Sequence, residues 1–154
     1  MIAMSKVCLA FYKGRKKVTN VKTALFRFTD WLTRTSTKGE FSHVELVIHY
    51  DDMGYDCYSS SSRDGGVRCK RIDVETDNWV LVPIDADVLQ IKRYYDETKH
   101  QKYDLLGAIA STIPFIQLKN RQFCSEWCFN AIKKGSKAGW RFSPNDLFEM
   151  FRTP

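Results

Sequence analysis

Apolar and polar side chains alternate along residues 41–50 more regularly than in any other part of the chain. A strand with this pattern presents two different faces, because successive side chains point to opposite sides of a sheet. One face is apolar and consists of Val44, Leu46, Ile48 and Tyr50, and the other carries His43, Glu45, Val47 and His49. Turn residues at 51–54 and the run at 55–60 then predict a returning strand. The segment therefore requires an antiparallel sheet with a second layer on its apolar face.

The order of the remaining elements predicts an α+β fold, an antiparallel sheet packed against helices. Further β-forming runs lie at 7–12, 67–72 and 79–84, and the four consecutive strands between 41 and 84 predict a meander. Apolar spacing predicts helices at 23–33, from Asp85 or Asp87 to 98, at 104–113, at 123–134, and from Ser143 onward. With 154 residues and no low-complexity tract, residues 1–154 are expected to form a single domain.

Composition and cysteine content limit the cellular compartments and partners to be expected for the chain. The formal net charge of +6 favours anionic partners in general, but the basic residues are spread thinly over the chain. Five cysteines without a secretory leader argue against a disulfide framework. The longest apolar stretch, residues 105–116, is shorter than the ~20 residues of a membrane-spanning helix and contains a proline. We therefore expect a protein of a reducing cytoplasm without a transmembrane segment.

Cys124 lies at the predicted start of the helix over 123–134. Backbone N–H groups in the first turn of a helix have no intrahelical acceptor and form the positive end of the helix dipole. They favour a thiolate and can stabilise an oxyanion. Cys128 lies a full turn further along and lacks this advantage, so we expect it in the core. Core packing is the alternative for Cys124 too, because free cysteine is often buried.

His43 is the candidate base for that thiol, since an imidazole within reach of a cysteine supplies the ingredients of a cysteine hydrolase. Glu45 follows on the same face of the strand and is the first candidate for the residue that orients the imidazole. Counting back from the hairpin turn places Ser60 opposite Glu45 and Ser62 opposite His43, and a shift of one residue would bring in Ser59 instead. A solvated histidine on an open sheet face is the alternative.

Two other kinds of site are less well supported by the same residues. Cys124 and Cys128, with His43 or His49, are suitable zinc ligands, but structural zinc usually binds a closer Cys-x-x-Cys pair on a turn. No strand alternates basic and aromatic residues as a nucleic-acid surface requires. We therefore expect no metal, no cofactor and no specific nucleic-acid partner.

Five short motifs follow one another from Phe41 to near the end of the chain. They are Ser42–Val47, Gly65–Arg68, Tyr103–Gly107, Phe123–Glu126 and Ser143–Leu147. In order and spacing they resemble the circularly permuted, NlpC-type branch of the papain-like cysteine hydrolases, which includes the bacterial YiiX-like proteins and related small proteins of phage genomes. The resemblance implies a permuted papain-like fold with the nucleophile at a helix N-terminus, and a bacterial or phage source.

The same resemblance implies that Cys124 is the nucleophile and His43 the general base, with Tyr103 and Asp104 in a structural or cleft-lining part. The implied reaction is hydrolysis of an amide bond through an acyl-enzyme, with a peptide or a peptidoglycan-like cell-wall peptide as substrate. A lipid-directed thiol acyltransferase or thioesterase, or an inactive binding module of the same fold, are the alternatives.

The chain departs from the pattern of these relatives at two places. Relatives often have His-x-Gly on this strand, where the present chain has Glu45 in place of the glycine. They also tend to carry an acidic residue on the next strand, where this chain has serines at 59–62. The orienting residue is therefore left open between Glu45, Ser60 (or Ser59) and a backbone carbonyl.

Overall fold

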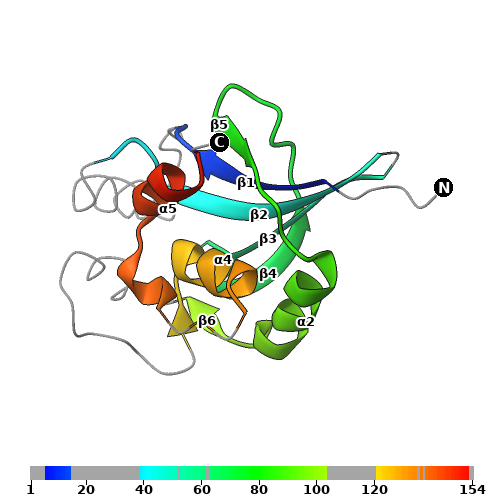
Figure 1. Ribbon diagram of the computed structural model, residues 1–154, viewed down its shortest axis with the longest axis vertical. Coiled ribbons are helices and arrows are strands. Elements are labelled where there is room, and N and C mark those ends of the chain that lie inside the picture. The colour runs from blue at the N-terminus through cyan, green and yellow to red at the C-terminus, as the bar shows by residue number, and fades with distance from the viewer. Residues whose placement is uncertain are drawn as a thin grey trace.

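A computed structural model describes residues 6–14, 39–51, 53–61, 63–103, 121–134, 136 and 138–152. The strands are β1 (Lys6–Tyr12), β2 (His43–Tyr50), β3 (Gly54–Ser61), β4 (Gly66–Arg71), β5 (Trp79–Pro83), β6 (Lys102–Tyr103) and β7 (Arg121–Gln122). The helices are α2 (Val88–Thr98), α4 (Cys124–Ile132) and α5 (Pro144–Phe151), with a 3-10 turn η1 (Gly139–Arg141). The predicted α+β class is confirmed (Figure 1).

The strands form one sheet in the order β5-β1-β2-β3-β4-β6-β7 (Figure 1). Neighbours from β5 to β6 pair antiparallel, and the short β6 and β7 pair in parallel. The predicted meander holds for β2, β3 and β4. Its extension to β5 is wrong, because β5 pairs with β1 at the other side of the sheet and β6 lies beside β4.

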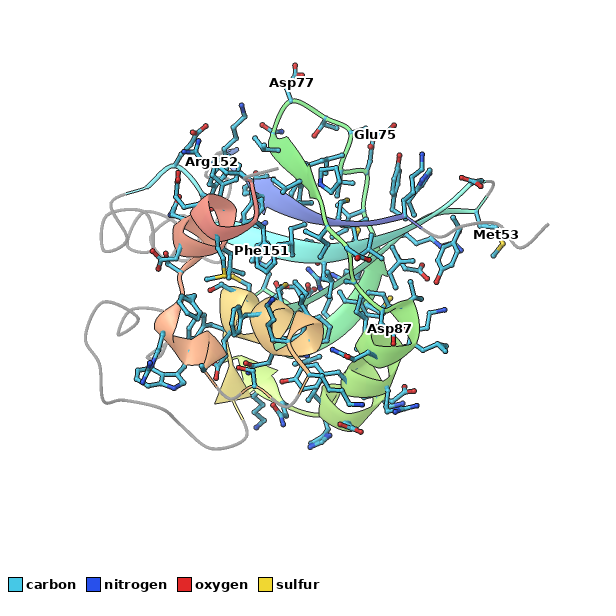
Figure 2. All side chains as sticks on the ribbon, in the orientation of Figure 1. Met53, Glu75, Asp77, Asp87, Phe151 and Arg152 are labelled. Carbon is cyan, nitrogen blue, oxygen red and sulfur yellow. The ribbon has the colours of Figure 1, made fainter. Side chains whose placement is uncertain are left out.

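The connection between β4 and β5 explains this strand order. Val74 in the connection is only 1% exposed and packs with Ala10, Val47 and Cys57 in a small second core. Burial of this apolar side chain holds the connection across the back of the sheet and brings the chain to the free side of β1. Figure 2 shows Glu75 and Asp77 of the connection on the opposite side of the sheet from α2 and α4.

The main core lies between the sheet and the helices. The predicted apolar face of β2 is confirmed, because Val44, Leu46 and Ile48 are fully buried in this core. α4 contacts β2 and β3 and is flanked by α2 and α5 (Figure 1). Trp127 of α4 is fully buried, and its Nε1–H donates to Oγ1 of Thr98 in α2 at 2.8 Å. α4 is therefore the central helix, fixed on both sides.

Two of the described helices, α2 and α5, begin at capping residues that the sequence indicates. Asp87 accepts backbone N–H groups at the start of α2 (Figure 2), and Ser143 forms a capping box with Asp146 at the start of α5. The helices predicted at 23–33 and 104–113 lie outside the described residues. Among the helices that the structure describes, none has the length and apolar character needed to cross a membrane.

Candidate active site

Cys124 is the first residue of α4, as the sequence predicts. The N-cap residue, Phe123, is extended (φ −94°, ψ 170°) and contributes no side-chain cap, so it does not compete for the N–H groups of the first turn. The first helical hydrogen bond runs from Trp127 N–H to Phe123 O. Cys124 is 3% exposed. Its sulfur therefore lies at the positive end of a buried helix.

His43 is the first residue of β2, and it connects the strand to the start of α4. Its ring lies close enough to Cys124 for the two side chains to interact electrostatically. Nε2 of the ring lies 2.6 Å from Oε1 of Glu45. The His43 side chain is 21% exposed, so the ring also meets solvent. The structure thus brings together the three residues that the sequence singles out.

The charges around His43 favour its protonated form. Burial alone would lower the pKa of His43, but the negative charges of Cys124 and Glu45 and hydrogen bonds to both raise this pKa from 6.5 to about 9. At neutral pH the ring is then an imidazolium with two N–H donors. An imidazolium beside a helix N-terminus is the electropositive environment in which thiolates are stable.

Glu45 is fully buried and contacts two cationic side chains. Nη1 of Arg68 on β4 donates to Oε2 of Glu45 at 2.7 Å, Nη2 of Arg68 donates to Oε1, and His43 binds the same Oε1. Burial alone would raise the pKa of Glu45, but the hydrogen bonds and charges of Arg68 and His43 lower it below 4.5. The carboxylate is therefore ionised at neutral pH and accepts the Nε2–H of His43.

The serines of β3 are shifted by one residue from the predicted register. The sequence predicts Ser60 opposite Glu45 and Ser62 opposite His43, and this is wrong. The observed pairing, continued along the two strands, sets Ser59 opposite Glu45 and Ser61 opposite His43. A run of four serines has no alternation of side-chain character, so only the length of the turn indicates a register.

Ser59, the alternative that the sequence leaves open, does not orient the imidazole either. Its Oγ donates to the carbonyl oxygen of Val44 at 2.7 Å, which directs the hydroxyl to the backbone of β2. Glu45, the first candidate for the orienting residue, has a side chain that contacts the ring of His43.

The other four cysteines lie where a thiolate is disfavoured. All five thiols are free. Burial raises the pKa of Cys8 to about 11 and that of Cys57 to about 12. Burial also raises the pKa of Cys69 and of Cys128, and Cys128 lies in the core as expected. Cys124 differs from these four by having an imidazolium partner.

Aromatic and basic side chains lie next to His43 on the sheet. The ring of Trp79 stands edge-on to the imidazole, with the centroids 6.5 Å apart. Tyr12 lies 5.0 Å from Trp79, and the guanidinium of Arg63 is 5.9 Å from the Tyr12 ring.

The remaining candidate residues lie elsewhere. His49 is at the far end of β2 and stacks on Tyr55, with the ring centroids 4.6 Å apart. His100 is exposed after the end of α2. The side chain of Tyr103 and all of Asp104 lie outside the described residues. Within the described ranges, no three His, Cys, Asp or Glu side chains gather as a metal site requires, so the alternative zinc site finds no support there.

Two further residues hold the site together, and sequence patterns do not reveal their roles. Arg68 reaches Glu45 from β4, and the sequence alone does not show that β4 lies two strands away from β2 in the sheet. Asn145 of α5 accepts the N–H of Phe41 on Oδ1 and donates from Nδ2 to the Phe41 carbonyl, each at 3.0 Å. This pair of bonds fastens α5 to the chain two residues before His43.

Replacing Asn145 with alanine is expected to lower stability and to slow alkylation of Cys124. The backbone of Phe41 would lose both bonds to the amide, at a cost of about 1–3 kcal/mol, and the start of β2 would be held less firmly. Urea unfolding and the iodoacetamide rate at Cys124 measure the two effects. Gln90→Ala is the matched control, because Gln90 Nε2 donates to the carbonyls of Ala131 and Ile132 at the other end of α4. Equal alkylation rates in the two variants would contradict a role for Asn145 in placing His43.

Comparison of the chain with models of protein families, with curated proteins and with solved structures gives no match.

Proposed function

We propose that the protein is a cysteine hydrolase that cleaves an amide bond, with Cys124 as nucleophile, His43 as general acid and base, and Glu45 as the residue that orients His43. The observation that carries the proposal is the proximity of the three side chains: His43 interacts electrostatically with Cys124 and lies 2.6 Å from Glu45. An antiparallel sheet packed on a helix that begins with the cysteine is what the resemblance to permuted papain-like hydrolases implies. The permuted papain-like fold is part of the same proposal.

The reaction begins with the ion pair of the Cys124 thiolate and the His43 imidazolium. The sulfur attacks the amide carbonyl carbon, the C–N bond breaks, and the imidazolium gives its proton to the leaving amine. The acyl group is then held as a thioester on Cys124. Neutral His43 takes a proton from water, the hydroxide attacks the thioester, and the carboxylic acid leaves with the thiolate restored. The sum is one amide and one water converted to one acid and one amine.

The surroundings of the two reacting side chains support these steps. The backbone N–H of Cys124, in the first turn of α4, can donate to the oxyanion that forms during attack. Glu45 remains a carboxylate throughout, because the hydrogen bonds and charges of Arg68 and His43 keep it ionised against the opposing effect of burial. Its task is to hold the imidazole in one orientation and to stabilise its charge.

The alkylation rate of Cys124 tests the nucleophile. At neutral pH, iodoacetamide should modify Cys124 far faster than Cys8 and Cys57, whose raised pKa values make them internal controls in the same molecule. Peptide mass spectrometry separates the three sites. Since Cys124 is nearly buried, this experiment tests access as well as reactivity. A Cys124 that reacts no faster than Cys8 would remove the main support for an enzyme.

Replacing His43 with alanine is expected to move the alkylation of Cys124 to higher pH. Loss of the imidazolium removes the cation that the proposal pairs with the sulfur, so alkylation should reach its half-maximal rate at a higher pH. The pH at which the alkylation rate is half-maximal measures the displacement. His49→Ala, at the far end of β2, is the matched control and should leave the profile unchanged. An unchanged profile in the His43 variant would rule out the pairing.

Products identify the substrate class. Incubation with muropeptides should give two fragments whose summed mass exceeds the substrate by one water, with none formed by Cys124→Ala. If long-chain acyl thioesters accumulate on Cys124 instead, the protein acts on lipids. If neither substrate is processed and no acyl adduct forms, the inactive binding module is the better description.

A further inference from the structure

We infer that Arg68 is a positioning residue of this site, whose guanidinium fixes the Glu45 carboxylate where His43 needs it to pair with a Cys124 thiolate. The inference rests on the proposed function and adds a fourth residue to it. The guanidinium of Arg68 hydrogen-bonds to Glu45, which in turn contacts His43, so Arg68 acts on the reacting pair through Glu45.

The contacts of Arg68 fix its guanidinium on two sides. Toward the site it pairs with both oxygens of Glu45, and on the other side its Nε donates to Oδ2 of Asp64 at 2.8 Å. Nη1 also donates to the carbonyl of Cys57 at 3.3 Å. The side chain is 14% exposed. A planar guanidinium bound on two edges has little freedom, so it defines the place of the carboxylate.

The local chain is built to let Arg68 reach across the sheet. β4 and β2 are separated by β3, so the two backbones lie about 10 Å apart. The residue between them in the same row is Ser59, whose small side chain turns to the backbone of β2 and leaves room for the longer arginine. The turn before β4 carries Gly65 at φ +84°, and a Cβ on Gly66 would lie 2.2 Å from the backbone oxygen of Gln101. Only glycine suits these two places, and the tight turn sets Asp64 beside Arg68.

The charges around Glu45 balance only when Arg68 is included. The titratable groups that interact with Glu45 or His43 include Cys124 and Cys128 from α4, Cys57 from β3, and Arg68 and Cys69 from β4. Asp64 from the turn pairs with Arg68 and with Lys70. The thiolate and the Glu45 carboxylate are two negative charges, and His43 and Arg68 are two positive ones. Without Arg68 the buried set is net negative and takes up a proton, either on the sulfur or on the carboxylate. Either event reduces the thiolate at neutral pH.

The pH profile of iodoacetamide alkylation at Cys124 tests the inference. Arg68→Gln should raise the pH of half-maximal rate by about one unit or more, and Arg68→Lys, which keeps the charge but not the two-edged contact, by less. Arg71→Gln is the matched control: the same strand loses the same charge, but this side chain is 67% exposed and pairs with Asp56 at 3.8 Å. Because solvent screens this exposed charge, Arg71→Gln should displace the pH of half-maximal alkylation by less than about 0.3 pH units.

A double variant decides whether Arg68 acts through Glu45. In a Glu45→Gln background, Arg68→Gln should add no further displacement, because the carboxylate that it positions is already gone. The comparison of the double variant with Glu45→Gln can also be made if Arg68→Gln alone does not fold. The double variant removes both members of the Arg68–Glu45 ion pair and so leaves neither of them buried without its partner.

Each outcome separates this inference from the proposed function. If the unaltered chain alkylates rapidly at Cys124 but Arg68→Gln follows the same profile, or moves no further than Arg71→Gln, the role of Arg68 is refuted and the hydrolase stands. If Arg68→Gln displaces the profile equally with and without Glu45, the guanidinium acts directly on the pair and the inference is wrong. A Cys124 that is slow in the unaltered chain removes both.

Discussion

Replacing Cys124 with alanine is expected to abolish amide hydrolysis, by at least about three orders of magnitude, while the chain keeps its fold. No other thiol is placed to substitute for it, since burial raises the pKa of all four. The change removes one sulfur at a helix start, so the stability should shift by only about 1 kcal/mol. Release of amine from a muropeptide, together with urea unfolding followed by circular dichroism, measures both effects.

Cys128→Ala is the matched control for this prediction. Cys128 lies one turn further along α4, fully buried, with its Sγ 3.8 Å from the Val44 carbonyl oxygen. Its loss should cost about 1–2 kcal/mol of stability and leave the turnover largely intact. If Cys128→Ala lost as much turnover as Cys124→Ala, the result would indicate a structural role for Cys124 and contradict the proposed catalytic one.

Replacing Glu45 with alanine should produce the largest loss of stability among single changes at the site, about 3–5 kcal/mol. The variant leaves the guanidinium of Arg68 in a buried place without its main partner. Urea unfolding at pH 7 gives the difference. Glu149→Ala provides the contrast, because Glu149 pairs with Arg152 at 2.9 Å on the surface and both side chains are more than half exposed. That pair should contribute less than about 1 kcal/mol.

The loss on removing Glu45 should also depend on pH in one direction. The folded pKa of Glu45 lies below its ordinary value of 4.5, so its stabilising contribution is complete above pH 4.5 and disappears as the pH falls through the folded value. The unaltered chain and Glu45→Ala should therefore converge in acid. A difference that stayed constant down to pH 2, or that matched Glu149→Ala at pH 7, would contradict a buried ion pair.

The sequence predicts the parts of the fold whose pattern is local. The alternation along β2 gives the buried face with Val44 and Ile48, and the capping residues Asp87 and Ser143 mark two helix starts. The order of strands is not local. Val74 sits in a connection without strand pattern, and its burial against the back of the sheet decides that β5 joins β1. Such a contact cannot be read from a single short segment.

The same distinction holds for the site. Cys124 and His43 are conspicuous because each residue type is rare and each stands at the end of an element, and Glu45 shares the face of His43. The register of the serines fails for want of an apolar pattern, and Arg68 is visible as a charge but not as a neighbour. Residues that carry chemistry can be found from their type, whereas residues that position them emerge only with the assembled sheet.

The contact between β2 and α4 has a consequence for how the chain matures. His43 belongs to the early part of the polypeptide and Cys124 to its last third. During synthesis, β2 with His43 is therefore made well before α4 brings Cys124 next to the imidazole. A nascent or partly opened molecule would lack the proximity of His43 to Cys124. Under the proposed pairing, the rate at which a thiol reagent modifies Cys124 should therefore rise only when α4 docks on the sheet. That rate would report the docking step during folding.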